Sequence, residues 1–444
     1  MKRFAALILV LGPCIAAGQQ GLGNLGGMPA NPGSGIAGQF FQGDFVNYNL
    51  FFSGLWDSAN QNIGSNSGGA GGFSMGGGVS LGKSFANGGS LGLSYRGDFR
   101  DYPGGYQGTG TNQFLSLDYS RRLGRRWSIS FVEGAGILFY NSPFYGSTLS
   151  PGGVPLTNPY SPTSRFLQSS VYLSYQQTAR LSYVFGGTFI LNRYNYGGAA
   201  GTNGGLGTAS VVYRLTRRTT IGGTYSHNYY HYQGGFGQST IDGGYANFSH
   251  IFGRGWEGHM SGGATYVRTN GILPFPQGLI LITPQGPILV FALPYNNKLT
   301  VPTIQGGIRR QFGKINIGVS AGHGVNPGNG TFLTSSHTFF GGSVSRSFGR
   351  QAVIAVNGNY SNLKSIAGAD QLKSQAPGQN YFNQGYSQMF LNVSYSRVIL
   401  RHLSGFATYS YNRYGSIGQF STAGDNRIIV GVAYTSKAIP FSLF

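Results

Sequence analysis

Short turns built from arginine and glycine recur along this chain, and each lies between segments in which apolar and polar residues alternate. Arg121 to Arg126, Phe252 to Gly255 and Phe348 to Arg350 are three of these turns. Longer connections rich in Gly, Asn, Ser and Pro join the same segments at their other ends. A side-chain period of two is that of a β-strand. Tight turns that alternate with long loops therefore predict a series of antiparallel strands.

The composition indicates where such a sheet would lie. Charged residues make up 9% of the 444 residues and aromatic residues 14%, whereas a soluble domain has roughly 25% charged residues. After residue 20, no segment approaches the roughly 20 consecutive apolar residues of a membrane helix. Lipid allows only helices and closed barrels, because every backbone polar group must be paired. The sequence therefore predicts an all-β fold, a transmembrane antiparallel up-and-down β-barrel.

The N-terminus has the pattern of a secretory signal peptide. Lys2 and Arg3 precede an apolar run from Phe4 to Ile15, and Ala16-Ala17-Gly18 supplies the small residues of a cleavage site. Cleavage is expected before Gln19.

Three parts follow from this pattern: a signal peptide at 1–18, a flexible Gly-rich leader at 19–43 and a single barrel domain at 44–444. The only cysteine, Cys14, lies within the signal peptide. The mature chain is therefore expected to have no disulfide and no cysteine-ligated metal.

Alternation assigns side chains to the two faces of each strand. Leu115, Leu117 and Tyr119 face one way, and Ser116 and Asp118 face the other. In a membrane the apolar face should meet lipid and the polar face should line the lumen. Repeating this assignment gives about 18 strands, with about 16 as the alternative count. The segments are 44–57, 73–84, 89–99, 111–121, 126–140, 166–178, 180–193, 207–216, 218–232, 240–252, 254–268, 300–312, 314–324, 337–348, 350–361, 385–397, 402–413 and 426–437.

Aromatic residues gather near the strand ends, as membrane interfaces require. Tyr229 and Tyr230 lie toward the long-loop end, Trp127 and Trp256 lie toward the short-turn end, and Phe444 ends the chain. With the signal peptide and the alternation, these features resemble the porin-sized outer-membrane barrels of bacteria, without pointing to a narrower family. The resemblance implies the outer membrane of a Gram-negative-type bacterium. It also implies outer-membrane lipid and the barrel assembly machinery as partners.

Six charged residues are expected to line the pore, and their mixed signs predict a transverse field across it. They are Arg96, Asp98, Asp118, Arg214, Glu257 and Arg309. The predicted function is passive diffusion of small hydrophilic solutes. A mild anion preference is expected from these arginines and from the net charge of +20, much of which lies in the short turns. Those turn residues either anchor the barrel to lipid phosphates or recruit anionic solutes.

Other functions remain open at this stage. A strongly basic lumen would instead suit an exporter of anionic polysaccharide. A non-conducting structural or adhesive barrel would act through its long loops, and a homo-oligomer is compatible with either. No nucleic-acid-binding module is recognisable.

The most unusual segment is the loop from Thr269 to Thr300. Two apolar arms flank the turn-forming residues Pro284 and Gly286, which predicts a β-hairpin. Pro274 and Pro294 are expected to limit strand pairing beyond it. Exposed to water, such a hairpin would aggregate; it should therefore constrict or plug the lumen, pack on other loops, or contact another subunit. The candidate constriction residues are Leu279, Ile280, Leu281, Ile282, Pro284, Gly286, Ile288, Leu289, Val290 and Phe291.

Catalytic and metal sites find little support. Asp98 and Asp101 could combine with His227 and His231 in a rim protease site, but a solvated carboxylate pair beside arginines is the expected arrangement. His227 and His231, four residues apart on a strand, would stand about 13 Å apart, too far for one ion. No enzyme activity, metal or cofactor is therefore expected.

One acidic residue does not fit the alternation. Glu133 falls on the apolar face together with Trp127, Ile129 and Phe131. Either a β-bulge reverses the faces there or the face assignment is wrong for this strand.

Overall fold

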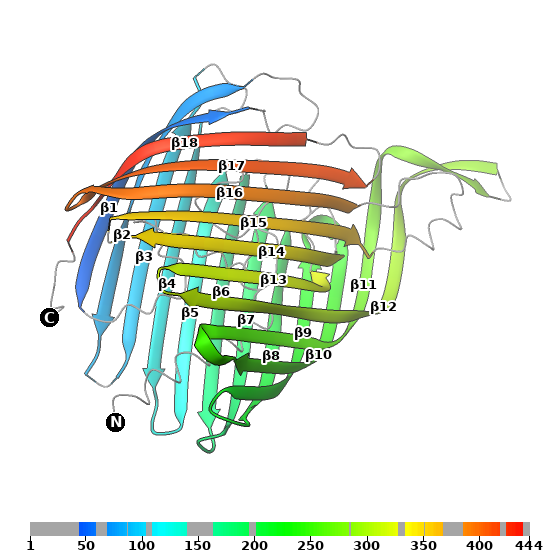
Figure 1. The fold of residues 1–444 in the computed structure, drawn as a ribbon. Helices are drawn as coiled ribbons and strands as arrows, with labels where there is room; N and C mark the ends of the chain where they lie inside the picture. Colours follow the sequence, from blue (N-terminus) through cyan, green and yellow to red (C-terminus); the bar gives the residue numbers. More distant parts are fainter. Residues whose placement is uncertain are drawn as a thin grey trace.

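The protein is a closed barrel made from a single sheet of 18 antiparallel strands, as predicted (Figure 1). The structure is a computed structural model that describes residues 44–58, 69–86, 88–103, 109–139, 163–194, 201–283, 286–326, 334–349, 351–366, 385–417 and 423–437. The strands are β1 (Phe45–Asp57), β2 (Ala70–Ser84), β3 (Ser90–Asp101), β4 (Gly110–Arg122), β5 (Trp127–Phe139), β6 (Thr163–Gln176), β7 (Leu181–Tyr194), β8 (Thr202–Arg214), β9 (Thr219–Tyr232), β10 (Gly237–Ile251), β11 (Trp256–Thr283), β12 (Gly286–Phe312), β13 (Ile315–Asn326), β14 (Ser335–Phe348), β15 (Ala352–Ser365), β16 (Gly385–Leu400), β17 (Leu403–Ile417) and β18 (Ala423–Thr435).

Each strand pairs with the next along the chain, and β1 pairs with β18 to close the barrel. The closing ladder runs from Asn49 opposite Thr435 to Asp57 opposite Arg427. This pairing closes the wall of the barrel on itself, which is the condition for a sheet in lipid.

The two ends of the barrel differ in their connections. At one end, at the lower left in Figure 1, turns of two to five residues join the strands, and Gly313 and Gly349 adopt positive φ angles of 56° and 63° in two of them. Such angles favour glycine, because a Cβ would clash. β1 begins and β18 ends at this short-turn end. At the opposite, long-loop end, consecutive strands are separated by more residues, as between β5 and β6 and between β15 and β16.

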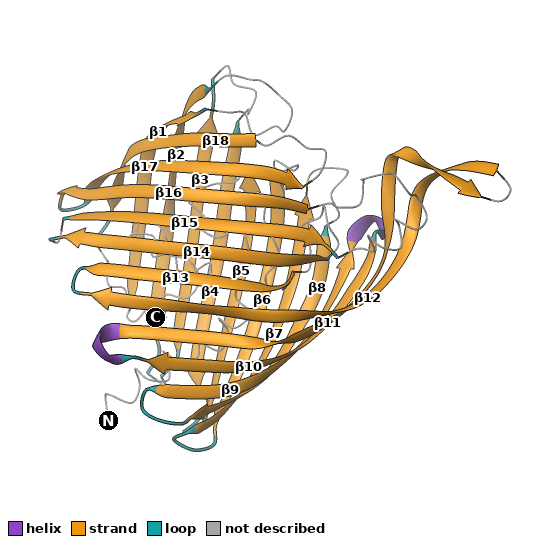
Figure 2. Ribbon diagram, turned by 45° about the vertical axis from the view of Figure 1, so that its right-hand side comes forward, coloured by secondary structure: helices purple, strands orange, loops and turns teal. Residues whose placement is uncertain are grey.

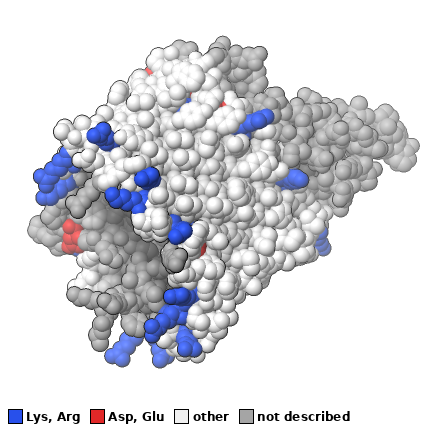
Figure 3. All heavy atoms as spheres, in the orientation of Figure 1, with Lys and Arg blue, Asp and Glu red and all other residues white. Residues whose placement is uncertain are grey.

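The wall is one strand thick, so burial distinguishes its two faces. On β1, Leu50 and Phe52 are 58% and 55% exposed and point outward, whereas Ser53 and Leu55, farther along the strand, are buried on the inner face. The same alternation continues around the sheet and covers the outer surface with exposed apolar side chains. In Figure 3 the described surface is largely uncharged, and most Lys and Arg atoms gather toward the lower left.

No helix in the described part of the chain is both long and apolar enough to cross a membrane.

β11 and β12 are longer than the sequence predicted. Pairing was expected to stop near Thr269 and Thr300, yet it continues through Pro274 opposite Ala292, is irregular between Pro274 and Leu279, and resumes toward the tip. Beyond the barrel rim this hairpin consists of two strands only, so each has an open side. A proline can pair there because its missing N–H can face that open side.

The hairpin predicted around Pro284 and Gly286 therefore forms, with Leu279 opposite Val290 and Thr283 opposite Gly286. Figure 2 shows its ribbon running past the rim and away from the barrel. The side chains of residues 273–295, which include all the candidate constriction residues, lie outside the described set.

Glu133 lies on the outer face without a bulge. Both ladders of β5 are continuous there, and Glu133 stands between Leu117 of β4 and Ser169 of β6. Exposed Leu115 and Val171 mark the outer face of those strands. Both explanations offered from the sequence, a bulge and a wrong face assignment, are therefore wrong, and this carboxyl group points away from the lumen.

Candidate functional site on the inner wall

The six charged residues predicted to line the pore all lie on the inward face. Arg96 and Asp98 alternate with outward Tyr95 on β3, and Asp118 is buried on the inner side of β4. Arg214 is the last residue of β8, at the short-turn end. Glu257 and Arg309 stand opposite each other on β11 and β12.

Glu257 and Arg309 are partners rather than opposite poles of the pore. Nε and Nη2 of Arg309 donate to Oε2 of Glu257 at 2.8 Å and 2.6 Å. Their side chains are 53% and 24% exposed, so the pair is solvated. The two charges largely cancel at one place on the wall, instead of setting up the transverse field that the sequence suggested.

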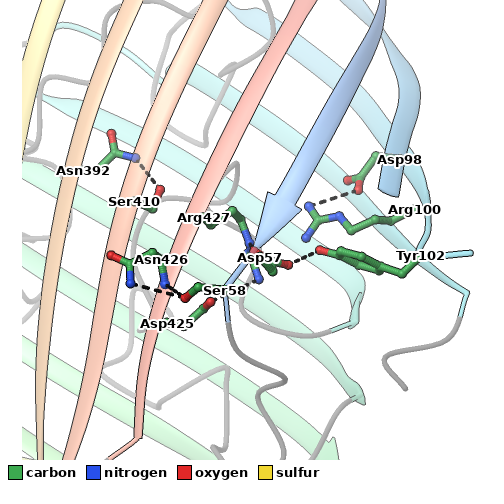
Figure 4. A network of polar contacts seen from close by, with 10 residues as sticks. All are labelled: Asp57, Ser58, Asp98, Arg100, Tyr102, Asn392, Ser410, Asp425, Asn426 and Arg427. Carbon is green, nitrogen blue, oxygen red and sulfur yellow. Dashed lines mark hydrogen bonds and ion pairs between the residues drawn. The ribbon is translucent and has the colours of Figure 1, made fainter. Parts of the chain in front are cut away.

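A larger charged network lies on the inner wall at the long-loop end, where the barrel closes (Figure 4). Asp57, the last residue of β1, accepts hydrogen bonds from Nε of Arg427 on β18 and from the Tyr102 hydroxyl after β3. Nη2 of Arg427 also lies 3.7 Å from Oδ2 of Asp425. All four residues are at least nine-tenths buried. The network therefore links strands at the two ends of the chain.

The network continues along β3 and β4. Nη2 of Arg100 lies 3.9 Å from Oδ2 of Asp98, and Nδ2 of Asn112 donates to the same oxygen at 2.9 Å. Asn112 Oδ1 in turn accepts the backbone N–H of Phe139 at the end of β5. Acidic and basic groups are thus matched within this part of the wall, as buried charges require.

Tyr102 is the neutral donor in this network. Its phenol is protonated at neutral pH and donates to Asp57, and burial raises its pKa further.

β2 lies between β1 and β3. It has glycine at the positions where large side chains of the neighbouring segments cross its inner face. A Cβ on Gly72 would lie 2.9 Å from Cδ1 of Tyr102 and 3.1 Å from Cδ1 of Leu55. A Cβ on Gly76 would lie 2.7 Å from Cζ of Phe51. The glycine-rich run in the sequence therefore opens space on the inner wall for large residues of the neighbouring strands.

Much of the remaining inner wall consists of hydroxyl groups paired between adjacent strands. Ser94 and Ser116 share a hydrogen bond of 2.7 Å, and Thr265 and Thr303 share one of 2.9 Å. Further pairs of this kind are Ser90–Ser120, Ser170–Thr188 and Ser210–Thr224. This lining is polar and uncharged.

A second polar cluster on the inner wall joins Thr334 to side chains of β9, β10 and β11. Thr334, directly before β14, shares hydrogen bonds with Ser239 of β10 at 2.6 Å and Thr269 of β11 at 3.1 Å. The hydroxyl of Tyr232 on β9 joins them at 3.2 Å. Thr334 thus contacts the wall at β9–β11, a contact that the sequence did not predict.

The residues considered for catalysis or metal binding do not come together. Asp98 faces inward and its former candidate partners His227 and His231 are exposed on the outer face. Asp101 also faces outward, where it accepts a hydrogen bond from Thr109. Asp98 is buried rather than solvated, so the expected carboxylate pair is not formed. The described residues contain no group of three His, Cys, Asp or Glu side chains able to hold a metal.

The sequence missed Asp57, Arg100, Tyr102, Asp425 and Arg427. Asp57 and Arg427 lie on the inward faces of their strands, so alternation could have placed both inward. Their pairing needs the β1–β18 register, which no local pattern shows.

No protein-family model matches the chain, and no curated protein is significantly similar to it in sequence. Among solved structures, the chain is similar to Pseudomonas aeruginosa OccK9 (OpdG), with 13% identity, a TM-score of 0.45 and coverage of 89% of this chain and 100% of that one. It is similar to Pseudomonas aeruginosa OccK2 (OpdF), with 11% identity, a TM-score of 0.44 and coverage of 89% and 99%. A BenF-like porin from Pseudomonas fluorescens Pf-5 shows 10% identity, a TM-score of 0.45 and coverage of 90% and 100%.

Proposed function

We propose that this protein is an outer-membrane channel for the passive diffusion of small hydrophilic solutes. The observation that carries the proposal is the contrast between the two faces of one closed wall: an exposed apolar outer surface and an inner surface of paired hydroxyls and balanced charges. Barrels of roughly 16 to 18 strands are wide enough for an aqueous lumen. Transport then depends on pore width and electrostatics, without a catalytic step.

We place the source of a mild anion preference at the short-turn mouth rather than along the lumen. On the inner wall, Glu257 is paired with Arg309, and the carboxylates of the long-loop end lie beside arginines. By contrast, the short turns carry exposed basic side chains, namely Arg121, Arg122, Arg125, Arg126, Arg217 and Arg218. A positive mouth raises the local anion concentration, and salt screens that effect.

The same balance disfavours an exporter of anionic polysaccharide. Such a polymer would need cationic contacts along its path, whereas Arg100, Arg309 and Arg427 of the described inner wall each lie beside a carboxylate.

Single-channel recording of the mature protein in planar bilayers tests the proposal. Stable conductance steps are expected, with a reversal potential in a KCl gradient that indicates a chloride preference. Replacing Arg125→Gln and Arg126→Gln should reduce that preference at low salt and leave the step size nearly unchanged. Arg346→Gln, at the same end but on the outer face, is the matched control and should change neither. A folded β-rich barrel that never conducts would overturn the channel and leave a structural or adhesive role.

A further inference from the structure

A cluster of polar and charged side chains lies on the outer face of β9, β10 and β11, outside the inner-wall site. Oδ1 of Asp242 accepts hydrogen bonds from Nδ1 of His227 at 2.7 Å and from the Tyr225 hydroxyl at 3.0 Å. Oδ2 of Asp242 lies 3.4 Å from Nη2 of Arg268. His227 and Arg268 remain about half exposed, at 53% and 48% of their side-chain surface. The carboxylate therefore holds an imidazole and a guanidinium in place while leaving both accessible.

The surrounding residues place this cluster at a membrane boundary. Nearer the short-turn end, the same outer face carries exposed Ile221, Phe248 and Met260. At the level of the cluster it carries Tyr225 and Tyr266 instead. Tyrosine marks the level of lipid headgroups, where one end of the side chain is apolar and the other is hydrated. His227 and Arg268 are thus presented at the hydrocarbon–headgroup boundary on the long-loop side.

Like charges stand directly opposite each other at two places on this outer face. Arg268 of β11 is in register with Lys298 of β12, and Arg165 of β6 is in register with Arg193 of β7. All four side chains are exposed. Like charges directly across an antiparallel ladder destabilise the sheet. An anion that contacts both members of a pair would turn that repulsion into attraction.

We propose that these basic pairs bind phosphate groups of lipid in the leaflet at the long-loop end. The first site consists of Arg268 and Lys298, with His227 and Tyr225 beside them and Asp242 as the positioning residue. The second consists of Arg165 and Arg193. Arginine offers planar sets of N–H donors that match phosphate, and lysine adds a point charge. A bisphosphorylated, multi-acylated lipid fits best, because its acyl chains would lie on the apolar surface below while its phosphates reach the pairs.

A lipid is a better occupant than free phosphate because of where the pairs point. They face away from the lumen, directly above the exposed apolar side chains of the same strands, so that a bound headgroup continues into acyl chains. This binding is independent of solute passage, since no residue of the inner wall takes part. A channel that does not conduct would leave the lipid sites untouched, and a failure of lipid binding would leave the channel untouched.

Native mass spectrometry of the mature barrel in detergent micelles tests this proposal, with three lipid A probes as ligands: bisphosphorylated, monophosphorylated and chemically dephosphorylated. The bisphosphorylated lipid should bind best and the dephosphorylated lipid should not bind. Arg268→Gln with Lys298→Gln should weaken binding by about tenfold, as expected from losing two charge-assisted contacts that are partly exposed. Arg165→Gln with Arg193→Gln should remove a separate binding event.

Arg346→Gln with Arg397→Gln is the matched control, because it removes two exposed outer-face arginines at the short-turn end that do not face each other. It should leave lipid binding unchanged. Heat-modifiable migration on gels verifies that every variant is folded. Equal binding of all three probes, or no loss in the paired variants, overturns the proposal. Displacement of the lipid by millimolar inorganic phosphate would also overturn it, in favour of a site for a free anion.

Discussion

Two carboxylate–guanidinium pairs on the inner face of this barrel differ in burial. Asp57 and Arg427 are 1% and 4% exposed and lie where β1 meets β18. Glu257 and Arg309 have side chains that are 24% and 53% exposed and lie near the short turns. The same type of ion pair therefore has different consequences at the two sites. A buried pair cannot lose one partner without leaving a charge out of water, whereas water compensates either member of an exposed pair.

The largest expected effect comes from breaking the buried pair. Replacing Arg427→Met leaves Asp57 and Asp425 without their cation and should lower the free energy of unfolding by about 3–5 kcal/mol. Urea unfolding of the barrel in detergent micelles, followed by tryptophan fluorescence, measures the loss. Arg309→Met, in the exposed pair, should cost about 1 kcal/mol or less. Equal losses in the two variants would contradict the distinction drawn from burial.

A second effect comes from filling the glycine gap beside the buried pair. In Gly72→Val the added Cβ would lie 2.3 Å from the Asp101 carbonyl oxygen and 2.9 Å from Cδ1 of Tyr102. Relieving this contact must displace Tyr102 from Asp57, at a cost of about 1–3 kcal/mol.

Gly71→Val is the matched control, since a Cβ there meets nothing within 4 Å and faces outward. The same unfolding measurement should leave this variant close to the parent protein. If both substitutions are tolerated, Tyr102 does not need the gap.

The exposed pair should instead influence permeation. The substitution Arg309→Gln removes a positive charge and leaves Glu257 as an uncompensated negative charge in water on the inner wall. The reversal potential in a KCl gradient should therefore shift toward a preference for cations. The shift should shrink as salt rises, because screening is strong over about 10 Å at 0.1 M. Arg427→Gln, if folded, should shift it less because its surroundings are buried. A larger shift in Arg427→Gln than in Arg309→Gln would indicate that ions pass close to the site where β1 meets β18.

The smallest effect concerns pH and the start of β1. Asp44 accepts hydrogen bonds from Lys83 Nζ and the Ser84 N–H, at 2.9 Å and 2.8 Å. The bond from Lys83 holds the pKa of Asp44 below its usual value of 3.8. A depressed carboxyl pKa stabilises the fold above pH 3.8, and this contribution is lost as the pH falls through the lowered pKa.

Asp44→Asn should therefore be slightly less stable than the parent at neutral pH and indistinguishable from it in strong acid. Thermal unfolding midpoints at several pH values compare the two. A difference that persists unchanged in acid would show that the charge on Asp44 is not its cause.

Most of the fold could be predicted from the sequence because the alternation of apolar and polar side chains along a strand is a local pattern. Arg96 and Asp98 were placed inward by their alternation with Tyr95 alone, whereas the alternation that put Glu133 on the apolar face was wrongly attributed to a bulge or a wrong assignment. The partnership of Asp57 with Arg427 spans 370 residues and depends on closure. The continuation of β11 and β12 was missed because prolines weaken strand signals, although a two-stranded extension tolerates them. The contact of Thr334 with Ser239 of β10 joins residues that are distant in the sequence, and no local residue pattern predicts it.

The β1–β18 ladder also has a consequence for the order of assembly. Every other ladder between the described strands joins strands that are consecutive along the chain. The β1–β18 ladder instead joins opposite ends of the chain, so it closes the largest loop, and we expect it to form last. Arg427 and Asp57 meet at that point, and their bond forms only after all the intervening strands are in place. The buried Asp57–Arg427 pair would therefore be made in the final step of folding.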